Sequence, residues 1–253
     1  MLSRKSFTLK LWDRINSHCR KRRLFKDKDS ILLAVSGGPD SVMMLDFFAK
    51  LAKKRRLDLA VAHLNHKIRG ANSDRDEAFV KKLGAVYGLQ TVTGTADVPA
   101  LARRLKISLE HAARRSRYGF LVKLALKKKY SLVATAHHAD DHTETVLLNL
   151  IRGTEPKGFL GIPVKRPLYI KGARKVFVIR PLLAVTKKEI MAYLKLNRLP
   201  HRRDESNEDE KHTRNWLRKT LLPLIEKKQP RFRAHMLELS AKLGRVLQRK
   251  DEG

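Results

Sequence analysis

The stretch Ser36-Gly37-Gly38-Pro39-Asp40-Ser41 decides how this sequence folds, because it joins two segments with different hydrophobic periodicity. Before it, residues 31–35 form an unbroken apolar run, which is typical of a parallel strand buried on both faces. After it, apolar residues recur at helical spacing from Val42 to Ala52. The glycines let the backbone approach an anion closely, and the following helix offers its N-terminus to that anion. The stretch therefore predicts a phosphate-binding loop between a strand and a helix.

The same alternation of strand and helix continues to about residue 200. Further strands are predicted at 57–63, 89–93, 132–135 and 177–179, and further helices at 73–87 (capped by Ser73), 97–105, 108–129, 139–151 and 186–196. This order predicts an α/β fold with a doubly wound parallel sheet of about five strands and helices on both faces. Ligands of such sheets bind beyond the carboxyl ends of the strands, where the unusual polar clusters of this sequence fall.

Charge divides the chain into three predicted regions. Residues 1–28 read as a basic amphipathic N-terminal helix, 29–200 as the α/β domain that carries the phosphate loop, and 201–253 as a basic helical region. Glycines and prolines between 152 and 167 predict a long irregular loop. The 253 residues carry 56 Lys and Arg against 25 Asp and Glu, a net charge of +31. Such an excess predicts a polyanionic partner, and nucleic acid rather than a membrane, since no run of about 20 apolar residues is present.

Cysteine usage excludes several kinds of chemistry. Cys19 is the only cysteine, so the sequence has no intrachain disulfide, no cysteine-based zinc cluster and no redox pair. This usage fits a reducing, cytoplasmic setting.

Asp40 and a second group of carboxylates are the main chemical candidates. Asp40 is a poor phosphate ligand by itself, but its carboxylate could hold Mg²⁺ that bridges bound phosphates. Asp141 and Glu144 are three residues apart on a predicted helix, and Asp140 shares their face. The alternative reading is ordinary acidic capping of that helix. Zinc held by His137, His138, Asp140 and Asp141 is not expected, because adjacent residues seldom converge on one tetrahedral metal.

Several basic residues could serve the same site. Arg114 and Arg117 lie on one predicted helix, where they either meet phosphate or form a solvated face. His63 follows the second strand, and by itself it reads equally as a core residue or as a cap. Arg214, Asn215 and Arg218 fit a helix that contacts phosphates or, again, a solvated face.

Taken in order, these motifs resemble a known family. The loop at 36–41 resembles that of the PP-loop ATPases, which cleave ATP between the α and β phosphates and adenylate a carbonyl oxygen. Seven further stretches, taken together, resemble the bacterial tRNA(Ile)-lysidine synthase family over roughly residues 30–223. They are 63–70, 110–118, 134–144, 152–158, 180–183, 204–207 and 214–218.

The resemblance implies a reaction and a set of roles. The expected reaction is ATP-dependent ligation of free L-lysine to C2 of the wobble cytidine in tRNA(Ile) bearing CAU, through an adenylated base, with release of AMP and pyrophosphate. The implied catalytic residues are Asp40, Arg114, Arg117, Asp141 and Glu144. The implied ATP-binding residues are Ser36, Gly37, Gly38, Pro39, Asp40, Ser41 and His63, with Mg²⁺ on Asp40. Asp141 and Glu144 would bind lysine, and tRNA would contact Arg69, Arg152, Asn207, Arg214, Asn215 and Arg218.

Two other functions and two open points remain at this stage. A PP-loop tRNA thiolase would share the adenylation step but usually needs catalytic cysteines, and a basic RNA-binding protein with an inactive ATPase fold would need neither the loop nor the carboxylates. Many family members continue into a C-terminal region that grips the tRNA, and we expect residues 1–28 and 211–250 to compensate for it electrostatically. The sequence leaves the oligomeric state open, a twofold homodimer included.

Overall fold

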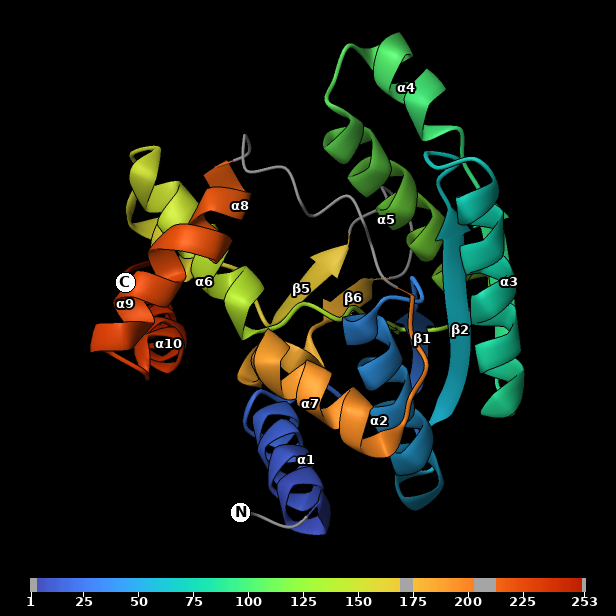
Figure 1. The fold of residues 1–253 in the computed structure, drawn as a ribbon, viewed down its shortest axis with the longest axis horizontal. Helices are drawn as coiled ribbons and strands as arrows, with labels where there is room; N and C mark the ends of the chain where they lie inside the picture. Colours follow the sequence, from blue (N-terminus) through green and yellow to red (C-terminus); the bar gives the residue numbers. More distant parts are fainter. Residues whose placement is uncertain (1–3, 169–174, 203–212, 252–253) are drawn as a thin grey trace.

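A mostly parallel sheet lies between helices in the computed structural model, which describes residues 4–168, 175–202 and 213–251 (Figure 1). The strands are β1 (Ser30–Ala34), β2 (Asp58–Asn65), β3 (Gln90–Thr95), β4 (Leu132–Ala134), β5 (Lys165–Leu168) and β6 (Val176–Ile179). The α-helices are α1 (Arg4–Lys21), α2 (Pro39–Arg55), α3 (Ala71–Val86), α4 (Val98–Leu105), α5 (Leu109–Lys127), α6 (Ala139–Ile151), α7 (Lys187–Asn197), α8 (Thr213–Trp216), α9 (Leu222–Lys228) and α10 (Phe232–Asp251). Short turns η1 (Pro156–Leu160) and η2 (Pro181–Ala184) and the π-helical turn η4 (Leu217–Leu221) complete the described elements.

The sheet has the order β3-β2-β1-β4-β6-β5, with β1 at its centre. In its middle, Leu32 of β1 aligns with Ala60 of β2 on one side and Val133 of β4 on the other. Five of the strands run parallel, and the order reverses between β2, β1 and β4. The phosphate loop therefore leaves the sheet at a topological switch point, where ligands of doubly wound sheets bind. The predicted α/β fold class is confirmed.

The sixth strand, β5, is the one element of the sheet that the sequence did not predict. It pairs antiparallel with β6 at the edge, with Pro167 aligned to Phe177. The prolines of this segment favour an irregular loop when read locally, but an edge strand tolerates a residue that donates no hydrogen bond. The segment 165–168 thus closes one edge of the sheet rather than continuing the irregular loop.

Alternate side chains of the central strands pack into two separate hydrophobic clusters, one on each face of the sheet. Ile31 and Leu33 of β1 join a large buried cluster with residues of α1, α2, α3 and α7. Leu32 faces the opposite way and packs with Leu121 and Leu124 of α5. Burial on both faces explains why the run at 31–35 is apolar without alternation.

Helix α3 begins two residues before its predicted start. The residue preceding it is Gly70, with φ +49°, and the helix starts at Ala71. Ser73 therefore lies inside the first turn and not at the cap, and its Oγ accepts a hydrogen bond from Arg69 N at 3.1 Å. Glycine at 70 can adopt the left-handed backbone that other residues avoid, and the local pattern of a polar cap followed by acidic residues hid this.

The basic helix α1 is joined to the core. Leu11, Ile15 and Cys19 are buried in the cluster that also contains α2 and α7, and Trp12 Nε1 donates to Tyr193 Oη at 3.1 Å. At the other end of the chain, Leu147 of α6 packs with Leu217 and Leu222 in a small third cluster. None of the described helices is both long and apolar enough to span a bilayer.

Candidate active site at the carboxyl edge of the sheet

The phosphate loop is shaped from within by Ser41. Its Oγ accepts hydrogen bonds from the backbone N of Ser36 at 3.2 Å and of Gly37 at 3.1 Å, and it donates to Gly38 O at 2.9 Å. Gly37 has φ +91°, and an added Cβ there would lie 3.2 Å from Phe79. The turn therefore requires glycine at position 37, and it lies at the N-terminus of α2, where Pro39 occupies the first turn and helix amides attract anions.

A chain of ion pairs ties this loop to two other segments. Arg202 donates its backbone N to Gly37 O at 2.9 Å, and its Nε lies 2.9 Å from Asp76 of α3. The same carboxylate pairs with Arg69 Nη2 at 2.7 Å. Arg69, predicted to contact tRNA, is thus connected to the phosphate loop through Asp76 and Arg202.

Asp40 has a cationic partner that is remote in sequence but lies on the neighbouring helix α7. Lys187 Nζ, in the first turn of α7, lies 2.6 Å from Asp40 Oδ1. The backbone N of the same residue donates to Asp140 Oδ2 at 2.8 Å. Lys187 therefore joins the phosphate loop to the acidic start of α6, and its ammonium group places a positive charge beside the Asp40 carboxylate.

His138 lies at the centre of the three aspartates. Its Nε2 is 3.8 Å from Asp40 and 3.5 Å from Asp141, and its Nδ1 is 3.4 Å from Asp140. Although burial works against its charged form, the carboxylates of Asp140, Asp141 and Asp40 raise the pKa of His138 above its ordinary value. A protonated His138 would hold these like charges together.

Asp140 is held by three partners, namely His138, the backbone amide of Lys187 and Arg233. Burial opposes its ionisation, but the hydrogen bond and charge of His138, the amide of Lys187 and the charge of Arg233 keep its pKa at about 2. Arg233 of α10 reaches it with Nε at 3.0 Å and pairs at the same time with Glu226. Asp140 thus fixes the C-terminal helix α10 to the site.

Asp141 and Glu144 lie on one face of α6, as predicted, but have different surroundings. Glu144 is completely buried, and Arg218 binds it with two hydrogen bonds at 2.7 and 2.9 Å, with Arg214 Nε 3.2 Å away. Asp141 Oδ2 accepts from His138 N at 3.0 Å and closes a capping box at the start of the helix. Its Oδ1 lies 3.9 Å from Arg218. Asp141 therefore caps α6, as the alternative reading expected, and it also lies beside His138 and Arg218, while its role as a lysine ligand stays a prediction.

The two arginines of α5 reach the same edge. Arg114 stacks on the ring of Tyr118 at 5.1 Å, and Arg166 of β5 lies 5.0 Å from that ring. Burial, then the charges of Arg180, Arg117 and Arg114, lower the pKa of His137 to about 3. Both Arg114 and Arg117 therefore act electrostatically on the segment between β4 and α6.

Two histidines, His63 and His66, lie at the end of β2 and differ in their surroundings. His63 Nδ1 lies 2.9 Å from Val35 O, the last residue before the phosphate loop, and its buried Nε2 has no hydrogen-bond partner among the described residues. Burial and the charge of Arg117 lower the pKa of His66 to about 4. His63 therefore braces the strand end from which the loop departs.

The remaining predicted tRNA contacts are not gathered at this point. Arg152 is exposed at the opposite end of α6 from Asp141. Asn215 is half-buried on α8, between Arg214 and Arg218. Asn207 lies outside the described residues.

Sequence reasoning did not assign roles to several residues that build the site. These are His138, Lys187, Arg180, Arg202 and Arg233. His138 was visible beside the acidic motif, but its contact with Asp40 depends on the fold. Lys187 and Arg233 had no local signal, because their carboxylate partners are 147 and 93 positions away (187 − 40 and 233 − 140).

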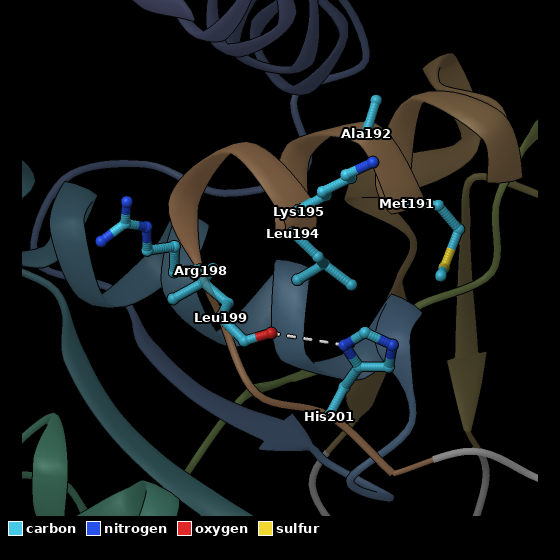
Figure 2. Close-up of a pocket in the computed structure, with 7 residues that line it drawn as sticks. All are labelled: Met191, Ala192, Leu194, Lys195, Arg198, Leu199 and His201. Carbon is cyan, nitrogen blue, oxygen red and sulfur yellow. Dashed lines mark hydrogen bonds between the residues drawn. The ribbon is translucent and has the colours of Figure 1, made fainter.

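A separate hollow lies beside α7. It has a volume of about 410 Å³ and is lined by Met191, Ala192, Leu194, Lys195, Arg198, Leu199 and His201 (Figure 2). His201 Nδ1 points toward Leu199 O, 3.3 Å away, in this view. The predicted site residues do not line it, so it is distinct from the carboxyl-edge site.

Residues 9–225 match a family model described as a PP-loop domain, which covers most of the chain. The chain belongs to the PP-loop family. The six-stranded sheet and the loop at its switch point agree with this membership.

Curated relatives point to one group within the PP-loop family. The chain is 44% identical over 207 residues to the tRNA(Ile)-lysidine synthase of Geobacter sulfurreducens, covering 82% of this chain and 42% of that protein. It is 36% identical over 228 residues to that of Geobacillus kaustophilus, covering 90% and 48%. For Chlorobaculum tepidum the values are 40% identity, 82% and 60%. The chain thus spans about half the length of the curated relatives it matches.

Solved structures of PP-loop proteins share the fold at low identity. The U34-tRNA thiolase NcsA from Methanococcus maripaludis, solved with its [4Fe-4S] cluster, superposes with a TM-score of 0.79 at 19% identity over 95% of this chain and 79% of that chain. The NH3-dependent NAD synthetase of Campylobacter jejuni gives a TM-score of 0.51 at 16% identity over 96% and 93%. These similarities support the fold alone.

Proposed function

We propose that this PP-loop protein ligates lysine to C2 of the wobble cytidine of a tRNA(Ile) bearing CAU, releasing AMP and pyrophosphate. The observation that carries the proposal is that His138 brings Asp40 of the phosphate loop within reach of Asp141 on the acidic helix, at 3.8 and 3.5 Å. The loop proposed to bind ATP and the carboxylates proposed to bind an ammonium group would thus share one edge of the sheet. The relatives named above are tRNA(Ile)-lysidine synthases, which supports the same reaction.

The loop at Ser36–Ser41 would hold the phosphates of ATP at the start of α2. Helix amides and the hydroxyl groups of Ser36 and Ser41 are suitable donors for phosphate oxygens. Asp40 is a half-buried carboxylate at this loop and so has the donor chemistry and place of a Mg²⁺ ligand. Bound Mg²⁺ would neutralise charge on the departing pyrophosphate. Lys187, which now pairs with Asp40, would then be released toward the phosphates.

Asp141 is the accessible carboxylate for the lysine ammonium. Its side chain is 21% exposed, whereas that of Glu144 is 0% exposed and already accepts two hydrogen bonds from Arg218. A carboxylate offers about four acceptor positions, so Glu144 can support a bound ammonium without losing its arginine. We therefore assign first contact with lysine to Asp141 and a supporting role to Glu144.

The base would be activated where Arg114 and Arg117 lie. A cytidine must leave the anticodon stack to reach the edge of the sheet. Its O2 would attack the α-phosphate of ATP, forming the adenylated base and releasing pyrophosphate. The amine of lysine would then attack C2, and AMP would leave with the former O2. Positive charge from the two arginines would stabilise the negative charge that develops on the phosphate.

A tRNA thiolase remains the enzymatic alternative, and the cysteine argues against it. Cys19 is 3% exposed in the core of α1, and burial raises the pKa of its thiol to about 12. The thiol form is a poor nucleophile and a poor cluster ligand. A Cys19→Ser variant should therefore keep its pyrophosphate release with lysine; dependence on a sulfur donor would favour the thiolase.

Release of pyrophosphate tests the proposal. With ATP, Mg²⁺, lysine and tRNA(Ile) bearing CAU, the wild-type protein should release pyrophosphate, and Asp40→Asn should lower the rate about 100-fold or more. Asp141→Asn should mainly raise the KM for lysine, by about tenfold, as expected for a lost charged hydrogen bond. Asp13→Asn, an exposed carboxylate of α1, serves as the matched control and should leave both values unchanged. No release with the cognate tRNA would overturn the assignment.

A further inference from the structure

Helices α4 and α5 form a hairpin that carries many cations and contributes little to the core. Between Asp97 and Arg117, the basic residues are Arg103, Arg104, Lys106, Arg114, Arg115 and Arg117, against the acidic residues Asp97 and Glu110. Val98 is the only buried residue of α4, and α5 packs into the core mainly through its second half. The hairpin thus extends beyond the sheet and is not explained by packing.

Each helix of the hairpin is capped where it begins. Asp97 accepts from Ala100 N at 2.8 Å at the start of α4, and Ser108 accepts from His111 N at 3.2 Å at the start of α5. Lys106 ends α4 in the left-handed conformation with φ +51°. Such capping holds an otherwise weakly packed hairpin in one shape.

Its outer cations differ from the arginines of the site. Arg69, Arg202 and Arg218 all pair with carboxylates. By contrast, Arg103, Arg104 and Arg115 are exposed, and no carboxylate of the described chain lies within ion-pair distance of them. Exposed cations without carboxylate partners are available to an anionic ligand, and their mutual repulsion is relieved when one binds.

The hairpin also adjoins the active site. Because α5 leads into β4, its N-terminal half lies at the carboxyl edge of the sheet, and in Figure 1 α4 extends past the tip of β2. Glu110 Oε1, at the start of α5, lies 3.8 Å from Arg214 of α8, which itself adjoins Glu144. A polyanion that lies along the hairpin would therefore reach the site without crossing another domain.

We propose that the α4–α5 hairpin is a docking surface for the sugar–phosphate backbone of a structured RNA, with Arg103, Arg104 and Arg115 contacting phosphates. The proposal rests on the proposed function and names the surface that delivers its RNA substrate. Released counterions drive such binding, which makes it strongly dependent on salt. Because phosphate contacts position a nucleic acid without reading it, this surface accepts stems of any sequence.

The test compares two triple variants in RNA binding without ATP or lysine. The hairpin variant is Arg103→Gln, Arg104→Gln and Arg115→Gln. The control variant is Lys53→Gln, Lys54→Gln and Lys127→Gln, which removes the same charge from exposed positions at the C-terminal ends of α2 and α5. The probes are an anticodon stem-loop bearing CAU and the same stem with another loop, titrated by fluorescence anisotropy at several salt concentrations. Thermal unfolding verifies that all variants are folded.

The hairpin variant should lose affinity for both probes alike. The affinity of the wild type for RNA should fall by a certain factor when salt rises from about 50 to 200 mM. Without three phosphate contacts, this factor should be about 20- to 40-fold smaller. The control variant should keep the wild-type salt dependence. Equal effects of both variants, or no RNA binding by the wild type, would overturn the proposal. So would hairpin-dependent binding to anionic phosphatidylserine vesicles without binding to RNA. Pyrophosphate release does not enter this test, so its result is independent of whether the catalytic assignment holds.

Discussion

At the scale of single residues, the site is built from charges that come from distant parts of the chain. Lys187 neutralises Asp40, Arg233 neutralises Asp140, and Arg218 neutralises Glu144. His138 lies between three aspartates, and they raise its pKa. Carboxylates this close together are costly unless cations accompany them, so these partners are what allows an acidic site beside a phosphate loop.

Gly37 should be the glycine of the phosphate loop that tolerates substitution least. Gly37→Ala places a Cβ on a backbone with φ +91° and 3.2 Å from Phe79, whereas the backbone of Gly38 has φ −71° and its Cβ would meet only Ser36 Oγ at 3.5 Å. We expect Gly37→Ala to cost about 1–2 kcal/mol of unfolding free energy and Gly38→Ala less than about 0.5 kcal/mol. Urea unfolding of both variants measures the difference, and equal costs would contradict the account of this turn.

Glu144 should matter more to stability than Asp141. Glu144→Gln leaves Arg218 and Arg214 facing a buried amide and should cost about 2–3 kcal/mol. Asp141→Asn retains a side chain that can cap α6 and should cost less than about 1 kcal/mol. Denaturant midpoints of the two variants provide the measurement. A larger loss for Asp141→Asn would show that the capping bond, rather than the arginine pair, holds this region.

At the scale of elements, α1 combines a basic exposed side with a buried side. Its apolar residues join the same core as α2 and α7, while Arg14 forms an ion pair with Glu189 of α7. Basic helices at chain ends are easily taken for surface appendages when judged by charge alone. The sequence predicts an apolar stripe of Leu9, Leu11, Trp12 and Ile15 on this helix, and the structure buries Leu11 and Ile15 but leaves Leu9 exposed.

His18 of α1 should make stability depend on pH. Burial and the charge of Arg22 lower the pKa of His18 to about 4, below the ordinary value of 6.5. The unfolded chain therefore binds a proton that the folded chain excludes, so the contribution is complete above pH 6.5 and is lost as the pH falls toward 4. His18→Gln should reduce the slope of unfolding free energy against pH in this window by up to about 1.4 kcal/mol per pH unit.

The matched control for this slope is His235→Gln on α10. His235 is exposed, so its replacement should leave the slope as in the wild type. Chemical denaturation at several pH values between 7 and 4 gives both slopes. An unchanged slope for His18→Gln would mean that His18 takes up its proton equally in the folded and unfolded chains.

At the scale of the whole molecule, the order of strands and helices was readable and the closure of the site was not. The apolar residues of 31–35 and of 132–134 predicted buried strands, because strands covered on both faces are mostly apolar, and the structure pairs these two strands side by side. The edge strand β5 was missed because Pro167 fits an edge but reads locally as a loop. Lys187, Arg218 and Arg233 reach their carboxylates from segments remote in sequence, and no local spacing encodes such pairs.

The net charge of +31 is likewise a property of the whole molecule. The chain spans about half the length of its curated relatives, and compensation of tRNA binding by residues 1–28 and 211–250 stays a prediction. The hairpin of α4 and α5 adds a third basic surface, which adjoins the site itself.

The most direct test of the lysine-ligase assignment is incorporation of labelled lysine into tRNA. The protein is incubated with ATP, Mg²⁺, isotopically labelled lysine and tRNA(Ile) bearing CAU, and the nucleosides of the digested tRNA are analysed by mass spectrometry. The account predicts that the wobble cytidine gains one lysine joined at C2, and that Asp40→Asn abolishes the product. An unmodified cytidine, or modification of that base without the label, would contradict it.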